Sequence, residues 1–195
     1  VAGELPSEPA VSIRGFPFLT QALEGRYDRV ELSIQDVERN GLTLASLDIA
    51  VLGARIPLSE AARGAVSVVP VEELNATAVV AYDEIVRRSG VKGIVVTPLA
   101  DGVRVTGSVT VLGRTIRAST SSSVRLDKGE VVVTARNIDV EGRTSVLINR
   151  AIAGRFNFRV DVPALPYGLR LTGVRASTEG LNLAASTGPT VLQRP

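Results

Sequence analysis

The sequence contains no histidine, no cysteine, no methionine and no tryptophan. Without histidine, Ser-His-Asp and Cys-His nucleophiles and every histidine metal site are excluded. Without cysteine, neither a disulfide framework nor a thiolate metal site can form. The remaining enzymatic chemistry is that of carboxylates, a Ser-Lys pair or an Asp/Glu metal site.

None of these remaining chemistries has a clear motif. Asp36 and Glu38 could project together from one strand, but the pattern is typical of a solvated edge. The Ser/Thr run 119–123 has no lysine at a useful spacing and no Gly-x-Ser-x-Gly elbow, so it reads as a polar strand face. No glycine-rich loop is arranged to hold phosphate. We therefore expect no catalytic residues, no metal and no cofactor.

Aromatic residues are scarce as well, at 4%, although 45% of the residues are hydrophobic and the mean hydropathy is +0.22. The apolar mass is therefore Val, Leu, Ile and Ala, which either build a large core or line a cavity. Composition leaves both readings open. The net charge is +2, and no basic cluster interleaved with aromatics is present, so nucleic acid is not an expected partner.

No run of about 18 apolar residues is present, so no segment is expected to span a membrane. The chain starts at Val1 rather than Met, as a trimmed or mature form would. We expect one lipid-binding domain over residues 1–195, with residues 1–9 as a flexible segment after a removed signal or anchor.

Most of the chain alternates apolar and polar residues with period two, which predicts antiparallel strands. Val30, Leu32 and Ile34 share one face, and Asn40-Gly41 is a strong two-residue hairpin signal. The alternation slips by one residue near Ala45-Ser46, which predicts a bulge or a bend. Similar runs flank the turns Asp101-Gly102, Gly113 and 127–129, and the tail continues the pattern to about ten strands in all.

Three segments break the alternation. Val71–Arg88 carries apolar residues at three- and four-residue intervals, acidic residues early and Arg87-Arg88 before Gly90, which predicts one long helix. A shorter helix is predicted over Thr144–Ala153, with Gly154 as its stop. A third helical turn is expected after Pro17, up to Gly25.

The predicted fold class is α+β, mostly β: a long, strongly curved antiparallel sheet wrapped around one long helix, with one or two shorter helices. If side chains do not fill the space inside the curved sheet, a ligand binds there, and a smooth lining of Val, Leu and Ala suits acyl chains. Each buried methylene contributes about 0.8 kcal/mol, so a lipid that crosses water needs such a shield. An ordinary filled core is the alternative.

The segment 11–30 resembles the opening signature of an actinobacterial cell-envelope family, long catalogued as a domain of unknown function, that includes the mycobacterial lipomannan elongation factor A. The matching residues are Gly15, Pro17, Phe18, Leu19, Thr20, Gln21, Gly25 and Tyr27. The ending is similar too, with Leu-Pro-Tyr-Gly-Leu at 165–169 and Gly-Leu at 180–181.

The resemblance implies a fold similar to the tubular lipid-binding (BPI-like) superfamily. It implies an extracytoplasmic protein of the periplasm or cell envelope, anchored or secreted through an N-terminal segment. It also implies phospholipid or glycolipid ligands, with phosphatidylinositol-type lipids as one candidate. A transient membrane surface is an implied partner, and the resemblance links the protein to envelope glycosyltransferases and lipomannan maturation.

Candidate ligand-contacting residues follow from the predicted helices and the tail strands. Arg14 and Arg26 flank the segment after Pro17 and are the candidate head-group ligands. This segment would close over a groove or touch a bilayer; a strand–helix corner packed on the core is the alternative. The predicted apolar groove and flap residues are Phe16, Phe18, Leu19, Leu23, Leu74, Ala78, Tyr82, Ile85, Leu147, Ile148, Ile152, Phe156 and Phe158.

Three functions remain open from the sequence. The first is a lipid carrier or lipid-presenting module. The second is a scaffold for envelope biosynthesis with a filled core. The third is a carboxylate-dependent enzyme on envelope glycolipids, which needs two inward carboxylates about 5–10 Å apart.

Overall fold

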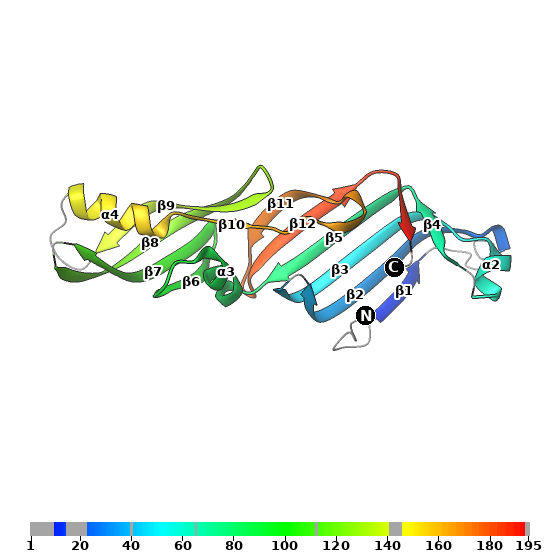
Figure 1. The fold of residues 1–195 in the computed structure, drawn as a ribbon, viewed down its shortest axis with the longest axis horizontal. Coiled ribbons are helices and arrows are strands. Elements are labelled where there is room, and N and C mark those ends of the chain that lie inside the picture. The colour runs from blue at the N-terminus through cyan, green and yellow to red at the C-terminus, as the bar shows by residue number, and fades with distance from the viewer. Residues whose placement is uncertain are drawn as a thin grey trace.

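The computed structural model describes residues 10–14, 23–39, 41–64, 66–111, 113–140 and 146–193. The chain forms two curled antiparallel sheets arranged end to end along an elongated molecule, with a small two-stranded ribbon at one end (Figure 1). The prediction of a mostly β, curved antiparallel architecture is confirmed.

The first sheet has six strands in the order β1-β2-β3-β5-β12-β11. The long hairpin β2–β3 was predicted from Asn40-Gly41 and is confirmed, because Arg39 pairs with Leu42 and Gly41 has a φ of 69°. The strand bounds are β1 (Ala10–Arg14), β2 (Arg26–Arg39), β3 (Leu42–Arg55), β5 (Glu73–Val80), β11 (Arg170–Ala176) and β12 (Leu181–Thr187).

The predicted slip in the alternation is present and takes the form of a bend in both strands of this hairpin. Ile34 pairs with Leu47 and Val37 pairs with Leu44, so the inward residues are three apart in each strand. The pairing between the strands stays in one register, and Asp36 between them has a φ of 53°. The left-handed residue absorbs the change of face without shifting the ladder.

The second sheet has five strands in the order β10-β9-β8-β7-β6. The predicted turn at 127–129 is confirmed: Asp127 pairs with Glu130, and both Lys128 and Gly129 have positive φ, as a tight hairpin turn requires. The strand bounds are β6 (Ile94–Leu99), β7 (Gly102–Val111), β8 (Arg114–Asp127), β9 (Glu130–Val140) and β10 (Phe158–Asp161).

The remaining elements are short. β4 (Val68–Val71) pairs with β13 (Thr190–Gln193) to form the ribbon. The helices of the described residues are α2 (Leu58–Ala62), α3 (Tyr82–Ser89), α4 (Val146–Phe156) and the 3-10 turn η1 (Pro166–Gly168). No helix in these residues is long and apolar enough to cross a membrane.

The prediction of one long helix over Val71–Arg88 is wrong. Residues 73–80 form strand β5 between β3 and β12, and only Tyr82–Ser89 is helical. The segment also fits period two, with Leu74 and Ala78 on one face, and its branched residues Thr77, Val79 and Val80 favour a strand. The sheet therefore does not wrap around a long helix.

The second predicted helix is present as α4, which runs to Phe156, so Gly154 does not end it. The third, after Pro17, falls mostly outside the described residues; only its end at Leu23–Glu24 is described, as a helical turn.

A single apolar core joins the two sheets. It includes Val80 and Leu181 of the six-stranded sheet, Val103 and Val105 of the five-stranded sheet and Ile85 of α3 between them. Because these side chains are almost fully buried, they hold the two sheets together where they meet.

Candidate functional site

The six-stranded sheet has one face made almost entirely of apolar side chains. In antiparallel strands, directly paired residues point to the same side, so the register identifies the members of this face. One row crosses all six strands: Val11, Leu32, Ile49, Ala76, Ala185 and Leu171. The central members, hereafter the apolar face, are Val30, Leu32, Ile34, Leu47, Ile49, Val51, Leu74, Ala76, Ala78, Val174, Leu183 and Ala185.

The opposite face of the same sheet is polar. Glu31 accepts hydrogen bonds from Arg14 at 2.6 Å and Arg29 at 2.7 Å, and Ser33 donates to Asp48. The two arginines hold the pKa of Glu31 below its usual value. A shallow hollow of about 490 Å³ lies over these residues and their neighbours Asn75 and Thr77. Arg29, Glu31 and Asp48, which line this hollow, already have hydrogen-bond partners on the polar face.

The middle of the apolar face is only partly covered in the described structure. Leu32, Ile49 and Ala76 keep intermediate exposure, whereas core valines such as Val103 and Val105 have none. The described helices lie elsewhere: α4 covers the five-stranded sheet, α3 sits where the sheets meet, and α2 is at the far end (Figure 1). A sheet normally buries its apolar face against another layer, so partial exposure here is unusual.

Neighbouring elements pack against both ends of the apolar face. At one end, Ile34 and Leu183 join the core between the sheets. At the other end, Leu74 is 3% exposed beside the ribbon, and a Cβ at Gly168 of η1 would stand 3.6 Å from the hydroxyl of Thr187. Between these ends, Val30 to Ile34 of β2 span four residues, or about 13 Å. One acyl chain occupies about 15 Å of a bilayer's depth, so the face is long enough for most of such a chain.

The predicted groove residues fall in two different places. Leu74 and Ala78 lie on the apolar face. Tyr82 and Ile85 lie on α3, where the Tyr82 hydroxyl donates to the Ser177 carbonyl oxygen at 2.7 Å and Ile85 is 2% exposed. Burial raises the pKa of Tyr82 above its usual value, despite the opposing effect of that hydrogen bond.

The remaining described groove candidates belong to the five-stranded sheet and its helix. Ile152 and Phe156 of α4 are completely buried, and Phe158 of β10 is 7% exposed. Phe156 packs against Gly107 of β7, where a Cβ would stand 3.3 Å from the ring. These three side chains are part of the buried core, so they support the fold and do not line an open groove in this structure.

Five of the predicted groove and flap residues cannot be placed: Phe16, Phe18 and Leu19 lie outside the described residues, as do the side chains of Leu147 and Ile148. Leu23, at the end of the predicted flap, is 71% exposed. The assignment of these residues to a groove or flap stays a prediction.

The two head-group candidates are both paired with carboxylates. Arg14 points to the polar face, where it contacts Glu31. Arg26 lies at the ribbon end of the sheet and contacts Glu72 at 3.3 Å, as Arg55 does at 3.4 Å. Of the two, only Arg26 stands near an end of the apolar face.

The central row of the apolar face was missed as a site. Ile49, Ala76 and Ala185 were not among the predicted groove residues, although their period-two pattern is visible in the sequence. The pattern shows that each faces one side of its strand. It does not show that three strands from distant parts of the chain lie side by side.

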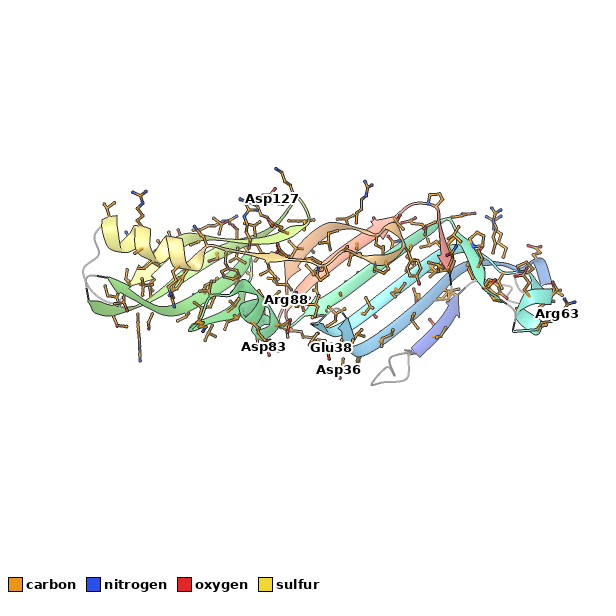
Figure 2. All side chains as sticks on the ribbon, viewed as in Figure 1. Asp36, Glu38, Arg63, Asp83, Arg88 and Asp127 are labelled. Carbon is orange, nitrogen blue, oxygen red and sulfur yellow. The ribbon has the colours of Figure 1, made fainter. Side chains whose placement is uncertain are left out.

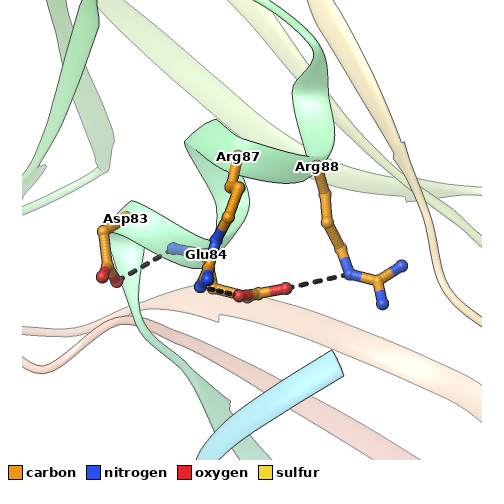
Figure 3. Close-up of polar contacts among 4 residues, drawn as sticks. All are labelled: Asp83, Glu84, Arg87 and Arg88. Carbon is orange, nitrogen blue, oxygen red and sulfur yellow. Dashed lines mark hydrogen bonds and ion pairs between the residues drawn. The ribbon is translucent and has the colours of Figure 1, made fainter. Parts of the chain in front are cut away.

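Acidic side chains give no sign of catalytic or metal chemistry in the described residues. Asp36 and Glu38 are exposed at the end of the β2–β3 hairpin (Figure 2). Glu84 is the buried acid, and both of its oxygens pair with Arg87 and Arg88 of the same helix (Figure 3). The described part of the chain thus has no pair of buried carboxylates and no acidic cluster suited to a metal ion.

Comparison with known proteins agrees with the apolar character of the site. No curated protein and no solved structure matches the chain significantly. The family model described as LmeA-like phospholipid-binding matches residues 2–186, nearly the whole chain. The chain therefore belongs to the LmeA-like phospholipid-binding family.

Proposed function

We propose that the protein carries a phospholipid whose acyl chains lie along the apolar face of the six-stranded sheet. The observation that carries this proposal is the partly exposed row of Leu32, Ile49 and Ala76 at the centre of that face. Covering such a row with methylene groups removes apolar surface from water on both partners, at about 0.8 kcal/mol for each methylene.

Family membership supports the same ligand class, since the matching family is phospholipid-binding. The finer part of the proposal is a role outside the cytoplasm, in the transport or maturation of cell-envelope lipids or lipoglycans, with phosphatidylinositol-type lipids as the first ligands to test. That part rests on the resemblance of residues 11–30 to the envelope family. An export-reporter fusion of the full coding sequence tests the location.

Lipid extraction tests the ligand. Protein purified without detergent is analysed by native mass spectrometry and, after solvent extraction, by lipid mass spectrometry. We expect a phospholipid at near-stoichiometric amount. If none copurifies and none is taken up from vesicles, the carrier function is rejected.

A scaffold in envelope biosynthesis is the second candidate, because much of the apolar interior is closely buried core, including Val103, Val105 and Phe156 of the five-stranded half. In that case a partner protein would cover the apolar face. Lipid-free protein that still binds an envelope enzyme through this face would favour the scaffold.

A further inference from the structure

The ribbon β4–β13 has one buried and one exposed face. Val69 and Val71 of β4 pair with Leu192 and Thr190, and these four residues are buried or partly buried. The alternate residues Val68, Pro70, Val191 and Gln193 share the outer face and are all exposed. The outer face therefore carries three apolar side chains and no charge.

The two valines of the outer face are unusually accessible. Val68 is 45% exposed and Val191 is 43% exposed. Solvent-exposed strands normally place polar or charged residues on their outer face, which also protects the strand edges from unwanted pairing. An uncharged, apolar outer face in a chain with 22% charged residues is typical of a surface that contacts a partner.

Tyr167 of η1 lies beside the ribbon. Its ring lies along β13: the Thr190 hydroxyl donates to the Tyr167 carbonyl oxygen at 3.2 Å, and the Tyr167 hydroxyl donates to the Gln193 carbonyl oxygen at 3.5 Å. Tyr167 is 41% exposed and has a φ of 56°, which is uncommon for a residue other than glycine. An amphipathic ring of this kind is favoured at a membrane–water interface.

The ribbon stands directly at one end of the apolar face. β4 packs against β3 and leads through Glu72 into Leu74, which is the last residue of the apolar face in β5. A lipid that leaves or enters the face at this end would pass beside the ribbon without crossing the polar side of the sheet.

The charges at the base of the ribbon favour an anionic surface. Arg26 and Arg55 share one carboxylate oxygen of Glu72, and both guanidinium groups are more than half exposed. Taken alone, this group of two arginines and one glutamate carries one net positive charge beside the base of the ribbon. Guanidinium groups in this position suit the phosphates of lipid head groups.

We propose that this end of the molecule, with Val68 and Val191 on the outer face of the ribbon and Tyr167 beside β13, docks on a phospholipid bilayer. This inference rests on the proposed lipid-carrier function, to which it adds the place where lipid is exchanged. Apolar side chains of the ribbon enter the interface, and Arg26 and Arg55 lie over the phosphates.

Vesicle flotation tests the docking surface. Vesicles of phosphatidylcholine, with and without phosphatidylglycerol, are mixed with the wild-type protein, with Val68→Thr/Val191→Thr, and with the matched control Val95→Thr. Val95 is 61% exposed in β6, far from the ribbon. Thermal melts check that all three proteins are folded.

We expect the double substitution to reduce vesicle binding about tenfold, because two hydroxyl groups replace buried methyl groups at the interface. The control should bind like the wild type, and anionic vesicles should bind more strongly. A wild-type protein that does not float, or a double variant that floats equally well, overturns the proposal. It is also overturned if the substitutions only convert a dimer to a monomer.

Lipid content measured on the same samples separates this inference from the proposed function. If the double variant keeps its copurified phospholipid but loses flotation, both proposals stand. If no protein contains lipid while flotation still depends on Val68 and Val191, the docking surface stands and the carrier function fails.

Discussion

The carboxylate of Glu84 is buried against the guanidinium group of Arg88. The Arg88 Nε atom lies 3.0 Å from the Glu84 Oε1 atom, and the Glu84 side chain is only 4% exposed (Figure 3). The Arg88 guanidinium also comes within 3.9 Å of where a Cβ at Gly41 would stand. The pair therefore links α3 to the turn of the long β2–β3 hairpin, at the junction of the two sheets.

Removing Arg88 should destabilise the protein more than removing Arg87. Arg88→Gln leaves a buried carboxylate with one partner fewer, and we expect a loss of about 2 kcal/mol in the free energy of unfolding, because the Arg88 side chain is itself mostly covered. Arg87 is 66% exposed, so Arg87→Gln should cost less than about 1 kcal/mol. Urea denaturation measures both, and equal losses would contradict the role assigned to Arg88.

Gly107 should tolerate no side chain, because a Cβ there would stand 2.9 Å from the Gly93 carbonyl oxygen and 3.3 Å from the Phe156 ring. Gly107→Ala is expected to lower stability by about 2 kcal/mol through overpacking. Gly154 of α4 is the matched control, since nothing lies within 4 Å of a Cβ at that position. Gly154→Ala should raise stability by about 0.5–1 kcal/mol. The two melting temperatures should move in opposite directions; a parallel shift would refute the packing argument.

Local features of the fold could be read from the sequence. Asn40-Gly41 and the turn at 127–129 have the residues that tight hairpins require, and both hairpins form. The slip near Ala45 also appears at its predicted place. In each case the determining interaction is made within a few residues, so a short window contains the information.

The segment 73–80 could not be assigned in this way, because its apolar residues fit both a helix and a strand. Leu74 and Ala78 are four apart, which suits one face of either element. The strand forms because β3 and β12 both pair with it, and β12 is about a hundred residues away in sequence. That pairing is not visible in any local pattern.

The candidate site shows the same limit. The motif from Gly15 to Tyr27 was enough to name the envelope family, and the family match agrees with it. It gave no register, however, so it could not show that Leu32, Ala76 and Ala185 form one row of the same face. An apolar face built from six strands is a property of the pairing, which only the structure supplies.

Stability should fall in alkaline solution through Tyr82. Its pKa in the folded protein is raised by burial above the usual value of 10.0, so the folded state holds this proton more tightly than the unfolded chain. The stabilising contribution is complete below pH 10 and is lost as the pH rises through the folded-state pKa. Urea midpoints measured across this range should show the loss in the wild type and a smaller one in Tyr82→Phe.

At neutral pH the same Tyr82→Phe variant should be about 1 kcal/mol less stable than the wild type, because the hydrogen bond to Ser177 is gone. A wild-type midpoint that stays constant above pH 10 would exclude this role for Tyr82.

Two neighbouring residues of β3 allow the lipid site to be tested within one strand. Ile49 is on the apolar face, whereas Ala50 points to the polar face, and both have intermediate exposure. Ile49→Thr keeps the branched shape that suits a strand but adds a hydroxyl group where an acyl chain would lie. We expect about tenfold weaker binding of a fluorescent phospholipid, the result of losing about 1.4 kcal/mol of apolar contact. Ala50→Thr adds a hydroxyl group of the same kind to the other side and should bind lipid like the wild type. Titrations of both variants, with urea midpoints to confirm that they are folded, decide the matter: equal affinities for the two would place the acyl chains somewhere other than the apolar face.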